Sequence, residues 1–408
     1  KIFAPDTALV KQSTNYLDKW INARSHSLIK FVKEELEAYR LYTVVGRLVN
    51  FLEDLTNWYV RMNRDRMRGN NGSNDALVAL CALYDVLLNT CVLMAPLTPF
   101  LTEFMYQNLA RALPDGHAMK RKSVHWVMFP DYDVEVIKPE VLLAVERLQS
   151  VVELGRTCRD RKRIGQRIPL KSMTLLNKNE LFLNDIRSLE GYLKEELNVR
   201  DVILSTDTST VVLAPTLNFK ILGKQLGKDM KRVQEVVKNL SQDDLQTFDR
   251  EGAITICGYE LTRNKGDPGN SELSVTPKVK DSHGSNFETH GNSESVVILD
   301  FTPDEDLEMM ATSRTISNVV QKLRKEAKLQ PFDLVDIWAT VKPSETSKGY
   351  LSEVLTAKKE YINSLLRSPL LDGGLLQGHE VSLITGQTVI GEEKDILVVT
   401  ITTPSKSA

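Results

Sequence analysis

The segment 41–68 carries residue types suited to RNA contact on one side of an expected helix. At 100° per residue, four polar side chains fall on one line: Asn57, Arg61, Arg64 and Arg68. Guanidinium groups form bidentate contacts with phosphates and base edges, and the flanking Trp58 offers a stacking surface. The same pattern also fits a solvated helix face, with Asp65 paired to Arg61 or Arg68 and Trp58 buried among other helices.

A dense run of positive charge lies between residues 156 and 171. Seven cations stand against one acid, Asp160; they are Arg156, Arg159, Arg161, Lys162, Arg163, Arg167 and Lys171. Like charges at this density repel one another unless an anion is near, so the run favours a surface that faces a polyphosphate. Cations at 161–163 also suit the negative end of a helix, which is the alternative interpretation.

The sequence holds no recognisable catalytic motif. Neither G-x-G-x-x-G nor a Walker loop occurs, because the segment 222–228 (LGKQLGK) lacks the required ending. The six histidines form no metal-spaced pair, and the four cysteines include no C-x-x-C. We therefore expect no catalytic residue, no metal site and no cofactor in this chain.

Composition sets the broad class and the expected surroundings. With 42% hydrophobic and 26% charged residues the 408-residue chain is typical of globular protein with several domains. The net charge of −2 means that any nucleic-acid binding must depend on local patches. Scattered cysteines fit a reducing compartment, and we expect no membrane span. Because the sequence begins at Lys1 without an initiator Met, we expect it to be part of a longer chain.

The elements that must position these residues change character along the chain. Amphipathic helices with short connections over 13–112 predict a helical bundle, for which we expect residues 1–135. In the 41–68 helix the apolar stripe Leu48, Leu52, Leu55 and Tyr59 lies opposite the arginines, so packing the stripe inward points the arginines outward.

Short strands alternate with helices after the bundle, which predicts an α+β multidomain fold. We expect the basic helix and a first α+β module over 136–262, a flexible loop or linker over 263–295, and a second α+β module over 296–408. A weak internal echo supports two related modules. Arg159, Arg163 and Ile164 before one strand resemble Arg324, Lys328 and Leu329 before another, although two weak copies also arise by chance.

Several of these segments resemble isoleucyl-tRNA synthetases. The stretch NWYVRMNR at 57–64 resembles the helix of their anticodon-binding bundle, and LMAPLTPF at 93–100 resembles the segment in which the chain restarts after a proline. The stretches NFK at 218–220, with LG at 222–223 and GK at 227–228, and QKLRK at 321–325 resemble the isoleucyl branch more specifically. The sequence departs from the family at Thr216-Leu217, which replace a proline, and at 310–315, where only Arg314 of the family's motif is kept.

The resemblance implies the C-terminal portion of the eukaryotic, cytosolic type of this enzyme. It implies that tRNA for isoleucine is the partner and that the following residues lie at the anticodon: Asn57, Trp58, Arg61, Asn63, Arg64 and Arg68. The family's H-I-G-H and K-M-S-K-S motifs are absent, so ATP and Mg²⁺ would serve only the longer enzyme and this part would be inactive alone.

Two alternatives remain at this point. One is the same region of a valyl- or leucyl-tRNA synthetase, against which Arg61 and the segment 218–228 argue. The other is an interaction scaffold that docks protein partners through residues 296–408.

Overall fold

The computed structural model describes most of the chain, namely residues 3–209, 211–264, 271–279, 286–292, 294–330, 333–366, 368–376, 381–391 and 394–404. By their internal contacts, Lys1–Val152 and Asn179–Glu196 form a first unit, and Glu153–Lys178 and Leu197–Ala408 form a second. The described part of the first unit is helical, whereas the described part of the second contains four small sheets. The predicted α+β multidomain class is therefore confirmed.

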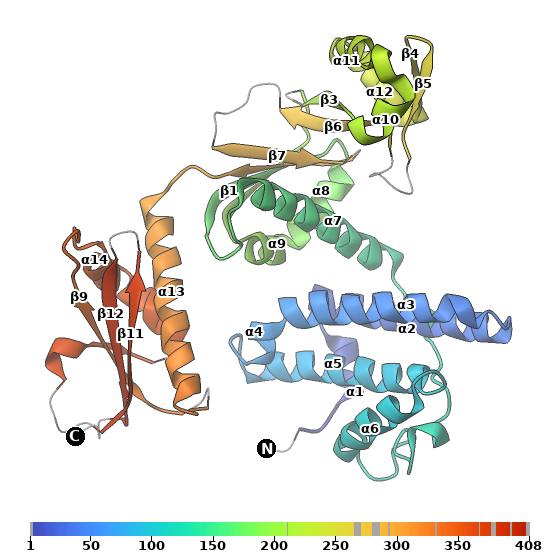
Figure 1. Cartoon of the computed structure of the whole chain (residues 1–408). Helices are drawn as coiled ribbons and strands as arrows, with labels where there is room; N and C mark the ends of the chain where they lie inside the picture. The colour runs from blue at the N-terminus through green and yellow to red at the C-terminus, as the bar shows by residue number, and fades with distance from the viewer. Residues whose placement is uncertain are drawn as a thin grey trace. The chain divides into compact units, whose positions relative to one another are not determined.

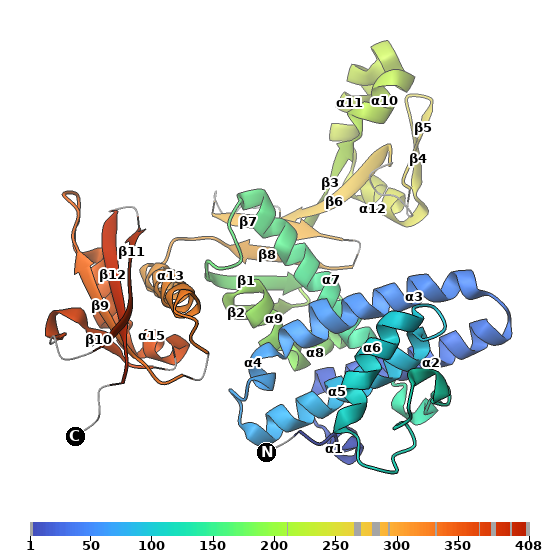
Figure 2. The same ribbon diagram turned by 60° about the horizontal axis from the view of Figure 1, so that its bottom comes forward.

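The first unit is a bundle of helices (Figures 1 and 2). Its elements are α1 (Thr7–Gln12), α2 (Tyr16–Glu37), α3 (Leu41–Glu53), the π-helical segment η1 (Asp54–Val60), α4 (Arg64–Met67), α5 (Ser73–Met94), α6 (Pro99–Leu109), the beginning of α7 (Pro139–Lys162), α8 (Glu180–Ser188) and α9 (Glu190–Leu197). Single 3₁₀ turns lie at Ala110–Ala112, Val124–Trp126 and Val134–Val136.

A side-chain cap on α2 and a buried apolar stripe both stabilise this bundle. The Asn15 side chain caps α2 by accepting from the backbone N–H groups of Leu17 and Asp18, at 2.9 and 3.2 Å. Leu48, Leu55 and Tyr59 of the predicted stripe are buried, so removal of their apolar surface from water stabilises the bundle.

Helix α5 lies in the core of the bundle. It packs against α1, α2, α4 and α6. Among the described residues it is the one helix long and apolar enough, by length and composition, to cross a membrane, and 56% of its most apolar window is buried inside the protein. Packing within the bundle accounts for that apolar composition.

The second unit begins with a four-stranded sheet. Its strands are β1 (Leu170–Leu176), β2 (Val199–Ser205), β7 (Phe287–Gly291) and β8 (Val296–Asp300), in the order β2-β1-β8-β7. β1 runs parallel to β2 and antiparallel to β8, and β7 pairs antiparallel with β8. The parallel pair requires a crossover, which α8 and α9 provide in the sequence.

A subdomain with its own core is inserted between β2 and β7. It consists of β3 (Val211–Leu217), α10 (Phe219–Leu226), the 3₁₀ turn η5 (Gly227–Asp229), α11 (Met230–Lys238), α12 (Gln242–Glu251), β4 (Ala253–Ile256), β5 (Tyr259–Thr262) and β6 (Leu273–Val279). β3 pairs with β6, and β4 with β5, both antiparallel. The helices gather beside the β4–β5 hairpin (Figure 1), around a core that includes Leu222, Val233, Phe248 and Leu261.

The second module repeats the topology of the first sheet. It contains α13 (Glu305–Glu326), β9 (Asp336–Lys342), α14 (Tyr350–Ala357), α15 (Lys359–Leu366), β10 (Leu370–Asp372), β11 (Ser382–Ile390) and β12 (Asp395–Thr402). The strand order is β10-β9-β12-β11, with β9 parallel to β10 and antiparallel to β12. Helix α13 lies along this sheet (Figure 1). Strand for strand, this order matches β2-β1-β8-β7.

The structure corrects the expected boundaries. The predicted loop 263–295 contains strands β6 and β7, and its residues 265–270, 280–285 and 293 lie outside the described part. Strand β8 belongs to the first sheet rather than to a second module beginning at 296, because it pairs with β1 and β7. The first unit also extends past residue 135 to include the beginning of α7 and Asn179–Glu196.

Candidate nucleic-acid interface

The helix expected over 41–68 is not continuous. Its middle winds as the π-helical segment η1, and a turn at Asn63 separates η1 from α4. Both changes shift the angle between successive side chains away from 100°. Asn57, Arg61, Arg64 and Arg68 are still exposed, but they do not follow the single straight line that the spacing predicted.

Asn63 is a structural residue. It is fully buried, its side-chain amide donates to the Tyr59 carbonyl at 2.9 Å, and its oxygen accepts from Arg66 at 3.3 Å. These bonds satisfy backbone groups at the turn, where the helical ladder is interrupted. This burial argues against a contact of the Asn63 side chain with the anticodon, because its polar atoms are engaged inside the turn; the expected contact stays a prediction.

A buried ionic network anchors this turn to helix α2. The Arg66 guanidinium is bidentate to Asp18, at 2.7 and 2.8 Å, and its Nε donates to Asp75 at 2.8 Å. The Asp18 carboxylate also accepts from the hydroxyls of Tyr59 at 2.7 Å and Ser13 at 2.6 Å. Burial alone would lower the pKa of Arg66, but the hydrogen bonds and charges of the two aspartates raise it above its ordinary value.

This network was not predicted from the sequence. Arg66 resembles its solvated neighbours in type and spacing, and only the packing of α2 against η1 and α4 shows that it is buried. Because bidentate charged pairs fix geometry, the network holds Arg61 and Arg64 on a rigid support.

The exposed residues on this support differ in their partners. Arg61 pairs with Glu196 of α9 at 3.0 Å, and its side chain is 41% exposed. Arg68 pairs with Asp65 at 3.6 Å, as the solvated-face alternative proposed. Trp58 is partly buried, and Arg64 forms no ion pair with any other described residue. The support thus presents Asn57, Arg61 and Arg64 to solvent.

Apart from Arg156, the basic run at 156–171 divides into three groups. Arg159 is buried and donates to the carbonyls of Gly165 at 3.1 Å, Ile168 at 3.0 Å and Leu197 at 2.5 Å. Burial lowers the pKa of Arg159 to about 10, so it keeps its charge at neutral pH. These bonds argue against a contact of Arg159 with a tRNA backbone, because its donors are already used inside the module; the expected contact stays a prediction.

A second group of the run pairs with an acid of the same sheet. Arg161 and Lys162 lie 3.6 and 3.9 Å from the Glu288 carboxylate of β7, and Arg161 also donates to the Thr289 carbonyl at 3.4 Å. Their charge is therefore partly neutralised. Arg156 is partly buried in α7.

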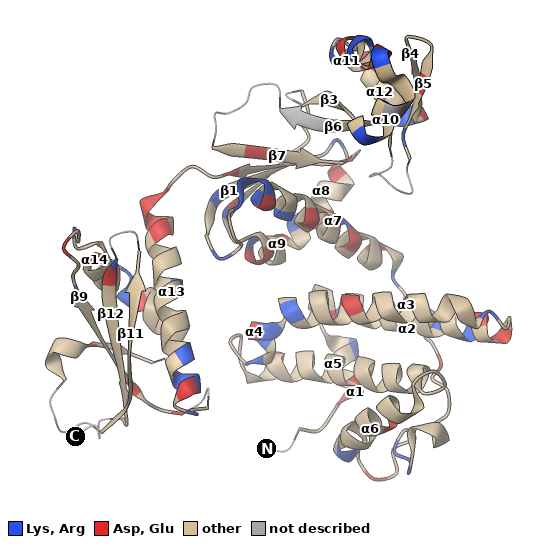
Figure 3. Ribbon diagram, viewed as in Figure 1, with Lys and Arg blue, Asp and Glu red and all other residues tan. Residues whose placement is uncertain are grey.

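Three cations of the run remain exposed without an acidic partner among the described residues: Arg163, Arg167 and Lys171. Figure 3 shows the Lys and Arg positions where α7 leads toward β1. Arg163 has a positive φ of 56° and ends the helix. Of the predicted phosphate-facing surface, these three residues are the exposed cations without an acidic partner among the described residues.

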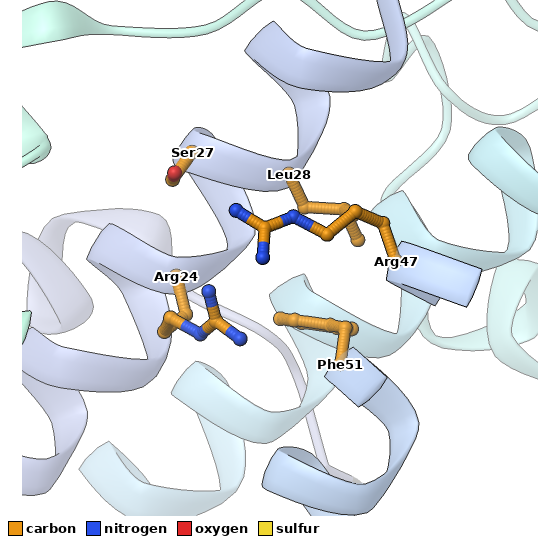
Figure 4. A pocket seen from close by; sticks show the side chains of 5 residues that line it. All are labelled: Arg24, Ser27, Leu28, Arg47 and Phe51. Carbon is orange, nitrogen blue, oxygen red and sulfur yellow. The ribbon is translucent and has the colours of Figure 1, made fainter. Parts of the chain in front are cut away.

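A small cavity lies between two helices of the first unit. A cavity of about 10 Å³ between α2 and α3 is lined by Arg24, Ser27, Leu28, Arg47 and Phe51 (Figure 4), and it is large enough for about one water. Arg24 is held by Asp54 at 2.5 Å, and the Arg47 guanidinium lies 5.3 Å from the Phe31 ring centroid. No group of metal-ligating side chains occurs among the described residues. The chemistry on offer is therefore that of an exposed surface.

Comparison with known families places both candidate surfaces within one matched segment. Residues 18–174 match the family described as "Anticodon-binding domain of tRNA ligase". Over these residues the chain is similar to the anticodon-binding domain of tRNA ligases. The matched segment includes both candidate surfaces, the one on η1 and α4 and the one at the end of α7.

Similarity extends beyond this domain to most of the chain. It is 41% identical to a probable cytoplasmic isoleucine–tRNA ligase of Dictyostelium discoideum, over 84% of this chain and 31% of the relative. It is 41% identical to the cytoplasmic isoleucine–tRNA ligase of Mus musculus, over 88% and 28%, and 36% identical to that of Arabidopsis thaliana, over 96% and 32%. The chain thus spans about a third of the length of the curated relatives that it matches. These names support the isoleucyl interpretation over the valyl or leucyl one.

Proposed function

We propose that this chain is the tRNA-recognition part of an isoleucine–tRNA ligase of the cytoplasm. The observation that carries the proposal is the match of residues 18–174 to the anticodon-binding domain. The names of the relatives, isoleucine–tRNA ligase and cytoplasmic, supply the amino acid and the location.

In this proposal the surface of Asn57, Arg61 and Arg64, with Trp58 beside it, contacts the anticodon. The bases of an anticodon loop are unstacked, so their edges are open to guanidinium groups and their faces to an aromatic ring. The buried bonds of Arg66 with Asp18 and Asp75 hold this surface rigid. A rigid support favours base readout because the contacts need little reordering. Arg68, which pairs with Asp65, is assigned a peripheral contact.

Phosphate contacts are assigned to the exposed end of the basic run. Arg163, Arg167 and Lys171 have charges that no described acid neutralises. Arg161 and Lys162 join them only if the RNA competes with Glu288. Phosphates position the RNA without reading its sequence.

The decisive experiment compares two RNAs on the whole chain. Filter binding or fluorescence anisotropy at one salt concentration should show tighter binding to isoleucine tRNA than to the same tRNA with a changed anticodon. Equal affinity for both would refute anticodon recognition, and no binding to either would refute tRNA recognition.

The ligase reaction itself is assigned to the longer protein. We propose that ATP and Mg²⁺ act there and that this chain alone does not activate isoleucine. Isoleucine-dependent exchange of pyrophosphate into ATP, measured on the pure chain, tests this. Exchange above background that disappears on omission of isoleucine would overturn the assignment.

A further inference from the structure

The subdomain inserted between β2 and β7 carries an unusual concentration of positive charge. Residues 218–240 contain six Lys or Arg against two acids, Asp229 and Glu235. This excess contrasts with the net charge of −2 for the whole chain. Because the subdomain has its own apolar core, including Leu222 and Val233, the charges are not needed to define its fold.

The cations gather around the turn between two helices. The turn η5 contacts both α10 and α11, and Figure 3 shows Lys and Arg positions on these elements. Four of these cations are exposed and form no ion pair with a described residue: Lys220, Lys228, Lys231 and Arg232. Asp229, the acid in the turn, accepts from the Tyr259 hydroxyl at 3.0 Å. This carboxylate keeps its charge and offsets only part of the positive charge, so an external anion can relieve the remaining repulsion.

An exposed aromatic ring lies beside these cations. Phe219 is the first residue of α10 and is 56% exposed. The helix begins there because the Asn218 side chain accepts from the Lys220 backbone N–H at 3.2 Å. The ring is not part of the subdomain core, so its apolar surface stabilises the fold little.

Gly223 lies one helical turn after Phe219 and keeps that side of α10 open. A Cβ at Gly223 would meet no atom within 4 Å, and its φ does not require glycine. Glycine inside a helix costs about 0.5–1 kcal/mol relative to alanine, and neither packing nor backbone geometry explains it here. Residues at i and i+4 share a helix face, so a side chain at 223 would cover the Phe219 ring.

We propose that the α10–α11 surface binds single-stranded RNA, with a base stacked on Phe219 and phosphates on Lys220, Lys228, Lys231 and Arg232. Stacking on an aromatic ring flanked by cations is the chemistry by which proteins hold unpaired RNA. An acidic protein partner would also meet the cations, but the open helix face beside a solvated ring favours a flat base. The proposal deepens the proposed function, because the natural RNA would be the same tRNA at a second place.

The test uses the whole chain and two labelled RNAs, isoleucine tRNA and a twelve-nucleotide oligouridine. Phe219→Ala should weaken binding to the oligouridine about 5- to 150-fold, which corresponds to about 1–3 kcal/mol for stacking on one aromatic side chain. Lys228→Glu with Lys231→Glu should lower the slope of log affinity against log salt by about 0.7 per lost contact. Gly223→Leu should weaken RNA binding while the melting temperature stays the same or rises.

Gly191 of α9 supplies a matched control. It is also helical and exposed, and a Cβ there would meet no atom within 4 Å, so Gly191→Leu should leave RNA affinity unchanged. The proposal is overturned if the folded Gly223→Leu and Phe219→Ala variants bind both RNAs like the wild type. It is also overturned if only the charge reversals change binding and they weaken binding of polyglutamate as much as binding of RNA. That result is expected of a surface that docks an acidic protein.

The two proposals fail separately. If the chain does not distinguish anticodons, yet oligouridine binding depends on Phe219, the proposed function fails and the α10–α11 surface stands. If anticodon discrimination holds and every α10–α11 variant binds normally, the reverse is true.

Discussion

Arg159 at the end of α7 and Arg324 at the end of α13 make equivalent contacts in the two modules. Both are buried. Arg159 donates to the carbonyls of Gly165 and Ile168, at 3.1 and 3.0 Å, and Arg324 donates to those of Gln330 and Asp333, at 3.1 and 2.9 Å. Gly165 and Gln330 lie 6 residues after their arginines, and Ile168 and Asp333 lie 9 residues after them. The two arginines therefore stabilise the same kind of turn.

The residues that follow extend this equivalence. Arg163 and Lys328 both have positive φ, 56° and 58°. The next residue in each case donates its backbone N–H to the carbonyl of the buried arginine: Ile164 to Arg159 and Leu329 to Arg324, both at 3.0 Å. The two sheets then share one strand order. The weak echo in the sequence is therefore a repeat of structure, in which one arginine of each basic helix end closes the turn before the first strand.

The first prediction concerns this shared turn. Arg159→Lys should destabilise the second unit by about 3 kcal/mol, because lysine keeps the charge but cannot reach the several carbonyls that the guanidinium satisfies. Arg324→Lys should have a smaller effect of the same sign, since fewer acceptors are involved. Chemical denaturation followed by circular dichroism measures both. If Arg159→Lys is as stable as the wild type but loses RNA binding, Arg159 contacts RNA instead.

The second prediction concerns the pH dependence of the bundle. Burial, and then the neighbouring Asp18 carboxylate, raises the pKa of Tyr59 well above 10.0. A group whose pKa is raised on folding stabilises the native state below its unfolded pKa, and this contribution is lost as the pH rises through the folded value. Between pH 9 and 11 the wild type should therefore lose more stability than Tyr59→Phe. At pH 7 the variant should be less stable by about 1.5–3 kcal/mol, because a buried hydrogen bond to the charged Asp18 carboxylate is lost.

Thermal melts of both proteins across that pH range give the comparison. Other tyrosines and lysines titrate in the same window, so the difference between the two proteins is the quantity that counts. Parallel curves above pH 10 would contradict the role assigned to Tyr59.

The third prediction concerns phosphates. Arg163→Glu, Arg167→Glu and Lys171→Glu should each weaken binding to all tRNAs alike and lower the log–log salt slope by about 0.7 to 0.9. Their exposed side chains have no acidic partner among the described residues, so stability should change little. Lys178→Glu, an exposed cation outside the run, is a control for net charge. If the salt slope of tRNA binding is unchanged in all three variants, these side chains do not contact phosphates.

The sequence was sufficient for what depends on periodicity and composition. The bundle and the exposure of Arg61 and Arg64 follow from helical periodicity, whereas strands β6 and β7 fell within the expected loop. It was insufficient for what depends on pairing between distant segments. The run Val296–Asp300 is apolar whichever sheet it joins, and only its pairing with β1 places it in the first.

The candidate site shows the same limit for arginine. Arg61, Arg66 and Arg159 are one residue type, but one is exposed and the other two are buried. A buried arginine needs acceptors that come from far along the chain, such as Asp18 for Arg66 and the Leu197 carbonyl for Arg159. No local sequence pattern marks those acceptors. A count of charges therefore overestimated the number of exposed cations, both on η1 and α4 and at the end of α7.

The last prediction separates base readout from phosphate contact at η1 and α4. Arg64→Ala and Arg61→Ala should each cost about 1–3 kcal/mol with the cognate anticodon and much less with an altered one, because a base-specific contact is already missing there. Arg61 must leave Glu196, 3.0 Å away, to reach RNA. Glu196→Gln should therefore raise affinity for the cognate tRNA and leave the effect of Arg64→Ala unchanged.

Asn63→Ala provides the contrast, because Asn63 is buried in the turn. It should lower the melting temperature and weaken binding only at temperatures where the bundle begins to unfold, whereas Arg64→Ala should melt like the wild type. Equilibrium binding to both tRNAs, with a melt for every variant, tests the set. If folded Arg61 and Arg64 variants lose equal affinity for cognate and altered anticodons, these arginines contact phosphates, and the reading of bases must be sought on another part of the domain.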